Sequence, residues 1–252
     1  MIGNKLKQKI RNCLSRVRHY LSKIKHLRDK CLVFSMGENC LTDGILSRND
    51  LKSFSSPFSS ARSNIEYILA FEKEKYFDFL NPYYLAYEMI GKTEVVRNKK
   101  YVATINHYND LCINGMEFTH HDVIGDTVKR KQIARRCKRL QNISNKNVVF
   151  VYHHRYCRET DMDMLVSCFE EVKRIYEARN NHVQIYIFGQ ERVSSNNDRT
   201  VICKEANGIK IYTFYTQNIW EGNDNDIFWA KCDDDLLQVM IDDIKEYIKH
   251  TI

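Results

Sequence analysis

The segment at positions 32–58 reads LVFSMGENCLTDGILSRNDLKSFSSPF, and it decides how the fold begins. An apolar run ends at Gly37, and the residues after it predict a short helix over 40–47. Cys40 therefore stands where a strand gives way to a helix N-terminus, a position that exposes a side chain and lowers the pKa of a thiol. We expect Cys40 to be reactive, with Gly37 and Asn39 beside it in a ligand site. The alternative is a small, buried, structural cysteine.

The second half of the chain repeats the strand pattern. Apolar runs rich in β-branched and aromatic residues lie at 148–152, 183–188 and 209–214, and residues 161–179 have helical spacing. Strands that alternate with a helix of this length indicate βαβ units. We predict an α/β fold with a mostly parallel or mixed, Rossmann-like sheet flanked by helices, one of them at residues 233–249.

The middle of the chain has weaker patterns. A helix is predicted to begin with Ser63 as its N-cap and to end at Leu80. Short strands, which could form a hairpin, are expected at 94–97 and 101–107. Residues 126–143 predict a further helix, and its exposed side is basic.

Residues 1–30 differ in charge from the rest of the chain. Ten Lys or Arg and one Asp give them a net charge of +9, so the remainder carries −2, since the whole chain is +7. Their apolar residues recur every three or four positions, which predicts a basic amphipathic helix preceding a single α/β domain over residues 31–252. Such a helix suits an anionic membrane surface, and docking on its own domain or on a partner is the alternative. The near-neutral body disfavours nucleic acid as a partner.

Composition excludes several classes of protein. No apolar run is long enough for a membrane-spanning helix. The nine cysteines include no C-x-x-C pair, so we expect neither a zinc site nor a thioredoxin-type motif, and no cofactor. An odd number of cysteines fits thiols in a reducing cytoplasm. The predicted location is therefore the cytoplasm, at the inner membrane if residues 1–30 bind there.

The predicted sheet brings separate segments together. Ligands of open α/β sheets bind beyond the carboxyl ends of the strands. Residues 37–40 follow the first strand, and His153, His154 and Arg155 follow the second; Gln190 with Glu191 follows another. Adjacent residues of an extended segment face opposite ways, so only one of the two histidines should enter a site with Cys40.

The chain also resembles a bacterial family of unknown function that is described as papain-like cysteine peptidases. A strand leads into S-hydrophobe-G-x-x-C, and an S-x-P-F segment follows about a dozen residues later. Ser59 and Ser60 stand where that family usually has Asp and Trp. The residues that carry the resemblance are Ser35, Met36, Gly37, Cys40, Phe54, Ser55, Pro57 and Phe58, then 118–122, Arg135, Arg136 and 148–151.

The resemblance implies a thiol-dependent hydrolase or acyl transferase. Cys40 would be the nucleophile and His121 the base, with His120 as the neighbouring candidate. Asp122 or Asp161 could orient the base, and of these we select Asp122. His153 and His154 are the rival bases that the sheet argument favours. Relatives of this kind are associated with surface-polysaccharide gene clusters, so the resemblance implies a glycan as readily as a peptide substrate. The alternating strands and helices argue against a true papain fold.

Two other functions remain open from the sequence. In the first, the protein is a glycosyltransferase, or a nucleotide-sugar or phosphate-binding protein of surface-polysaccharide assembly, in which Cys40 is structural. Arg155 and the basic helix over 126–143 would then bind the phosphate. In the second, the chain is a non-catalytic interaction module that needs neither group.

Overall fold

A five-stranded sheet is the centre of the molecule. The computed structural model describes residues 30–101, 103–104, 107–220 and 230–251, so the helix predicted over residues 1–30 lies almost wholly outside the described part. The order of the strands is β1-β5-β6-β8-β7, and all neighbours are parallel except the edge pair β7 and β8. This mixed α/β sheet confirms the predicted fold class. The strands are β1 (Cys31–Ser35), β5 (Asn147–His153), β6 (His182–Arg192), β7 (Thr200–Ala206) and β8 (Ile209–Thr216).

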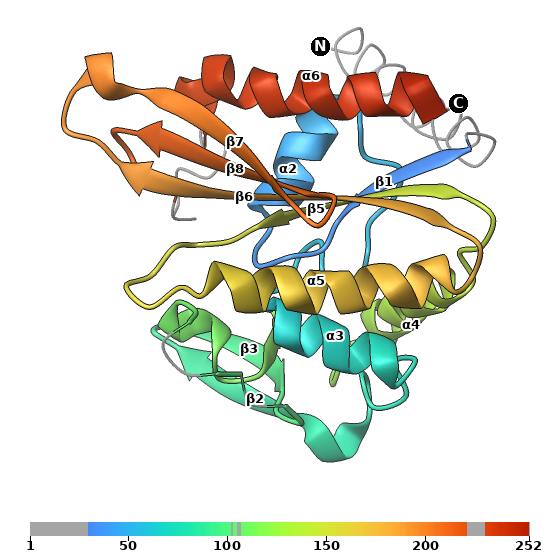
Figure 1. Ribbon diagram of the computed structural model, residues 1–252. Coiled ribbons are helices and arrows are strands. Elements are labelled where there is room, and N and C mark those ends of the chain that lie inside the picture. Colours follow the sequence, from blue (N-terminus) through green and yellow to red (C-terminus); the bar gives the residue numbers. More distant parts are fainter. Residues whose placement is uncertain (1–29, 102, 105–106, 221–229, 252) are drawn as a thin grey trace, which may run out of the picture.

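Helices cover both faces of this sheet (Figure 1). Helices α2 (Leu41–Arg48) and α6 (Asp234–Thr251) lie on one face. On the other lie α3 (Ile65–Lys73), α4 (Thr127–Gln141) and α5 (Met162–Glu177). None of the helices within the described ranges is long and apolar enough to span a bilayer.

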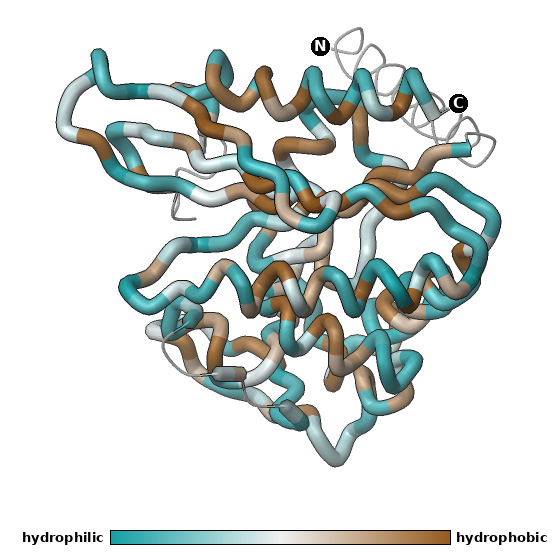
Figure 2. The backbone as a smooth tube through the Cα atoms, in the orientation of Figure 1, coloured by the Kyte–Doolittle hydropathy of each residue, from teal (hydrophilic) through white to brown (hydrophobic). Residues whose placement is uncertain are grey.

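The central strands are apolar on both sides because both faces are covered, as parallel sheets require. Val149 and Val151 of β5 face a cluster formed with α2 and α6, which we call the α2–α6 cluster. Their neighbours Phe150 and Tyr152 face the opposite cluster, which is formed mainly with α3, α4 and α5 and is called here the α3–α5 cluster. Figure 2 shows the resulting band of hydrophobic residues through the middle of the molecule.

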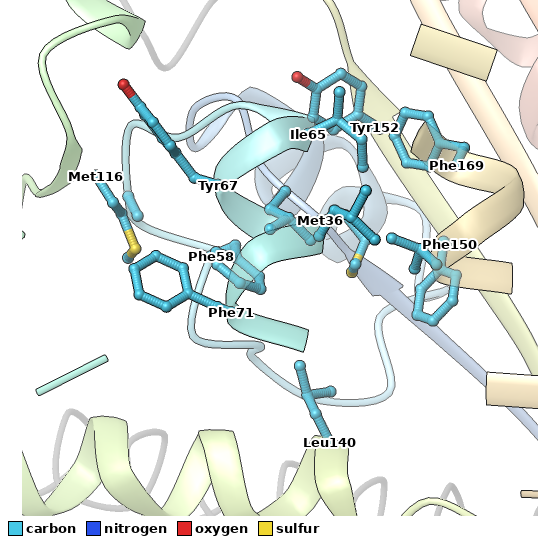
Figure 3. Close-up of a cluster of buried hydrophobic side chains, with 14 of the residues drawn as sticks. Met36, Phe58, Ile65, Tyr67, Phe71, Met116, Leu140, Phe150, Tyr152 and Phe169 are labelled. Carbon is cyan, nitrogen blue, oxygen red and sulfur yellow. The ribbon is translucent and has the colours of Figure 1, made fainter. Parts of the chain in front are cut away.

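The α3–α5 cluster joins the first strand to the middle of the chain. Met36, directly after β1, lies at its centre, between Phe58 and the aromatic side chains of β5 (Figure 3). The loop that carries Phe58 also covers the open edge of β1. There the Ser53 N–H donates to the Val33 carbonyl at 2.8 Å, and the Ser56 hydroxyl donates to the Ser35 carbonyl at 2.6 Å. An edge strand covered in this way is protected from pairing with other chains.

A smaller sheet lies beyond α3 (Figure 1). It is antiparallel, in the order β2-β3-β4, and the buried Arg97 of β3 bonds the buried Glu117 of β4 at 2.9 Å. The strand predicted at 94–97 is confirmed. The second strand predicted for the hairpin, at 101–107, is wrong, because the described residues of that range form no strand. The strands are β2 (Leu85–Ile90), β3 (Thr93–Asn98) and β4 (Met116–Phe118); short 3-10 helices cover Pro82–Tyr84, Asp110–Cys112, Asn196–Asp198 and Lys231–Asp233.

Helix α3 differs from its prediction at both ends. Its N-cap is Asn64, whose side chain accepts from the Tyr67 N–H, rather than Ser63. The helix ends at Lys73, well before Leu80, because Lys75 and Tyr76 have φ of +52° and +59°. Left-handed residues cannot continue a right-handed helix. The buried aromatic rings that follow are therefore carried by tight turns.

Candidate functional site

The turn after β1 requires glycine at position 37. Gly37 has φ of +106°, and a Cβ there would lie 2.4 Å from the Ser63 hydroxyl oxygen. No other residue type fits both conditions. The turn also lies beside the end of β5, because the Met36 N–H donates to the Val151 carbonyl at 3.0 Å. Gly37 thus directs the next three residues toward β5.

Cys40 follows this turn as the N-cap residue of α2. It is half-buried and packs against the α2–α6 cluster. Asn39 fixes the start of the helix, since its Oδ1 accepts from the Leu41 N–H at 3.0 Å. This bond also settles which end of the Asn39 amide carries nitrogen. The thiol is therefore carried by a helix N-terminus, as the sequence predicted.

Asn39 links the Cys40 turn to His153. Its Nδ2 lies 3.3 Å from Nδ1 of His153, and an amide nitrogen can only donate, so Nδ1 accepts and the ring proton is on Nε2. The imidazole stacks on Phe188 at 4.9 Å between centroids and is 1% exposed. Burial, followed by the charges of Arg155 and His154, holds the pKa of His153 well below its usual value. His153 is thus a neutral imidazole at neutral pH.

His154 faces the other side of the sheet, as alternation along a strand predicts. Its ring contacts Tyr108 of the α3–α5 cluster, whereas His153 packs against Phe188 of the α2–α6 cluster. Both ring nitrogens of His154 are hydrogen-bonded: Nδ1 to Glu38 at 2.9 Å and Nε2 to the Thr160 hydroxyl at 3.1 Å. Of the two histidines, His153 therefore shares a face with Cys40.

Glu38 is a site residue that the sequence analysis did not identify. Its side chain is fully buried, and its carboxylate accepts from His154, from the Tyr152 hydroxyl at 3.1 Å and from the Arg155 N–H at 2.8 Å. The available signal was its place inside the G-E-N-C turn, where an acidic residue is costly to bury unless it has partners. The partners come from the end of β5.

His121 and Asp122 lie between β4 and α4 in the chain. Burial, followed by the charges of Arg136, Lys129 and His120, lowers the pKa of His121 to about 4. Both of its ring nitrogens are buried and lack a hydrogen-bond partner among the described residues. The Asp122 carboxylate accepts instead from Tyr87 and from the N–H groups of Ile124 and Gly125. The expected His121–Asp122 hydrogen bond is therefore not formed.

Gln190 and Glu191, the third segment predicted to reach the site, differ in their roles. Gln190 lies within β6, which extends beyond its predicted end, and its side chain is buried. It donates to the Thr216 hydroxyl and accepts from the Trp220 N–H at 2.8 Å. Trp220 in turn lies 6.5 Å from the His153 ring, between centroids. Gln190 holds an aromatic wall of the site, while Glu191 is exposed.

The predicted basic helix lies apart from the site around Cys40 and His153. Helix α4 is basic on its exposed side, and a shallow depression there is lined by Val128, Lys131, Ala134 and Arg135, none of which belongs to the Cys40 turn. Across the described residues, no three His, Cys, Asp or Glu side chains are arranged as metal ligands.

The S-x-P-F loop, which carries part of the family resemblance, has a structural role. Ser59 stands where Asp was expected, and its hydroxyl accepts from the Ser56 N–H at 2.9 Å. Arg136, from the basic pair, donates to the Ser56 carbonyl at 3.5 Å. The S-x-P-F loop is thus held at the edge of β1, close to the turn that leads to Cys40.

Comparison with known proteins identifies the family of the chain. The curated proteins and the solved structures gave no match to the chain. A family model matches residues 31–188, which are more than half of the chain and run from β1 into β6. The matched part includes Cys40, His121, His153 and Glu38. The chain therefore belongs to the family described as "putative papain-like cysteine peptidase (DUF1796)".

Proposed function

We propose that the protein is a cysteine-dependent hydrolase in which Cys40 is the nucleophile and His153 its proton acceptor. The observation that carries the proposal is the 3.3 Å contact between Asn39, the residue before Cys40, and Nδ1 of His153. Cys40 and His153 also pack against the same α2–α6 cluster. A thiol nucleophile needs a nearby base in its neutral form, and the lowered pKa of His153 keeps it neutral.

The proposed reaction is acyl transfer in two steps. The Cys40 thiol proton moves to Nδ1 of His153 as Sγ bonds the carbonyl carbon of an amide or ester. The imidazolium then protonates the leaving amine or alcohol, and the carbon–heteroatom bond breaks to leave a thioester on Cys40. Water attacks the thioester, loses its proton to His153, and releases the acid as the thiol is restored. Asn39, which binds Nδ1 in the resting site, must give way during the first step.

The choice between His153 and His121 depends on their surroundings. Both are neutral at pH 7, since the pKa of His121 is lowered to about 4 and that of His153 is also lowered. His153 is tied to the residue next to Cys40, whereas His121 interacts with charges of α4 and with His120. We therefore favour His153, and His121 stays a prediction of the sequence resemblance.

An experiment can distinguish two substrate classes, peptides and acylated glycans. A peptide amide follows from the description of the family. An acyl group on a cell-surface glycan stays a prediction from the sequence. Either bond places an electrophilic carbonyl at Cys40, so each substrate forms a thioester there, and the acyl group it carries tells the two classes apart.

The experiment offers the full chain a panel of peptides, O-acetylated glycans and 4-nitrophenyl acyl esters. Acid quenching followed by peptide mass spectrometry identifies the residue that carries the acyl group. We expect hydrolysis and a thioester on Cys40, both of which are lost in Cys40→Ala and kept in Cys168→Ala. Activity that survives in folded Cys40→Ala, or an acyl group on another residue only, would contradict the proposal.

A further inference from the structure

Glu38 joins two segments that lie more than a hundred residues apart. Its side chain is 0% exposed, and three donors converge on it. Oε1 accepts from the Tyr152 hydroxyl and from Nδ1 of His154, and Oε2 accepts from the Arg155 N–H. Tyr152 lies near the carboxyl end of β5, and His154 and Arg155 follow directly after the strand, so one carboxylate binds the strand end and the residues that continue it.

The chemistry of these contacts requires a carboxylate. A carboxylate offers acceptors only, whereas a glutamine side chain of the same size would turn an NH₂ group toward one of the three donors. A buried carboxylate is stable only when hydrogen bonds compensate for lost hydration, and the three donors at β5 do so. The three donors therefore favour a side chain at position 38 that has both the length of glutamate and a charged carboxylate.

Glu38 also fixes the state of His154. Because Glu38 can only accept, Nδ1 of His154 must carry a proton, and Nε2 faces the Thr160 hydroxyl at 3.1 Å. The ring is held on both sides and does not turn toward Cys40. His153, the next residue back, is thereby left as the imidazole on the Cys40 side of the sheet.

We propose that Glu38 is a positioning residue for the reaction at Cys40. It lies two residues before Cys40 and anchors the turn to the strand that carries His153. Replacing the carboxylate removes one of the ties between the turn and β5, beside the bond from the Met36 N–H to the Val151 carbonyl; this alters the Asn39–His153 contact and slows proton transfer from the thiol. The inference rests on the proposed function, because it assigns Glu38 a role in presenting that same thiol and imidazole.

The test compares Glu38→Gln with Glu72→Gln in the full chain. Glu72 is a matched control: its carboxylate is also buried and accepts from two tyrosine hydroxyls, Tyr76 and Tyr176, in the α3–α5 cluster. The first readout is the pH profile of Cys40 alkylation by iodoacetamide. The second is the ¹⁵N NMR spectrum of the histidine rings, which reports the tautomers of His153 and His154 with no substrate and no reactive thiol.

Both readouts have a defined outcome. We expect Glu38→Gln to slow Cys40 alkylation at pH 6 by about tenfold, the equivalent of one pKa unit, and to change the His154 tautomer. Glu72→Gln should change neither. Unchanged ring spectra and alkylation in folded Glu38→Gln would overturn the inference. If wild-type Cys40 is no more reactive than other thiols, the proposed function fails, and the ring spectra still decide whether Glu38 positions the histidines.

Discussion

Nδ2 of Asn39 lies 3.3 Å from Nδ1 of His153, so the residue before Cys40 holds the imidazole at the end of the neighbouring strand. The same amide also bonds the first residue of α2 through its oxygen, which accepts from the Leu41 N–H. One side chain therefore sets both the start of the helix that carries the thiol and the tautomer of the proposed base. The predictions below separate these two roles.

Asn39→Asp should change the pKa of the base and keep the bond to the start of α2. Aspartate still accepts from the Leu41 N–H, but it cannot donate to His153, and its charge favours the imidazolium form. We expect the pKa of His153 to rise, as measured by NMR titration of its ring. Asn49→Asp at the other end of α2 is the control, because Asn49 bonds the Ile45 carbonyl rather than a histidine. Equal effects of the two substitutions would refute a direct contact.

The buried His153 should make the protein less stable in acid. Its folded-state pKa is lowered, so the unfolded chain binds more protons than the folded chain below about pH 6.5. This contribution to stability is present above pH 6.5 and is lost as the pH falls, at up to about 1.4 kcal/mol per pH unit. Between pH 7 and 5, urea unfolding should show wild type losing up to about 2 kcal/mol more than His153→Gln. Equal losses of stability in the two proteins would show that His153 is protonated as easily in the folded chain as in the unfolded chain.

Two glycines near Cys40 should respond in opposite ways to alanine. Gly37→Ala forces a strained φ and places Cβ 2.4 Å from the Ser63 hydroxyl oxygen, so we expect a loss of about 1–3 kcal/mol of stability. Gly44→Ala lies inside α2 with no atom within 4 Å of the new Cβ, and it should gain about 0.5–1 kcal/mol. Denaturant unfolding measures both. A Gly37→Ala protein as stable as wild type would show that the turn is not held as described.

Most of the architecture could be predicted from the sequence because it follows from periodicity. The apolar runs and the helical spacing between them gave β1, β5, β6 and β8, and the Asp126 and Asp161 caps mark where α4 and α5 begin. Strand β7 was missed because its residues are largely exposed at an edge. The Asn207–Gly208 turn between β7 and β8 was the signal for that hairpin, since both residues have positive φ.

The site was harder to predict because it depends on contacts between distant segments. Cys40, Asn39 and His153 could be selected from strand ends, and alternation predicted that His153 and His154 would face opposite ways. Which of the two shares a face with Cys40 depends on the register of β5 against its neighbours, which one sequence does not contain. Glu38 was missed for the same reason: its partners lie more than a hundred residues away.

The most direct test of the account is site-resolved alkylation at pH 6, with Cys40 and Cys168 measured in the same sample by peptide mass spectrometry. Cys168 is the internal reference, because burial, followed by the charges of Glu66 and Glu171, raises the pKa of its thiol to about 11. We predict that Cys40 reacts at least about tenfold faster than Cys168, and that His153→Gln, but not His121→Gln, removes the difference. A Cys40 rate no greater than that of Cys168, or a loss of reactivity in His121→Gln with none in His153→Gln, would contradict the proposed pairing of Cys40 with His153.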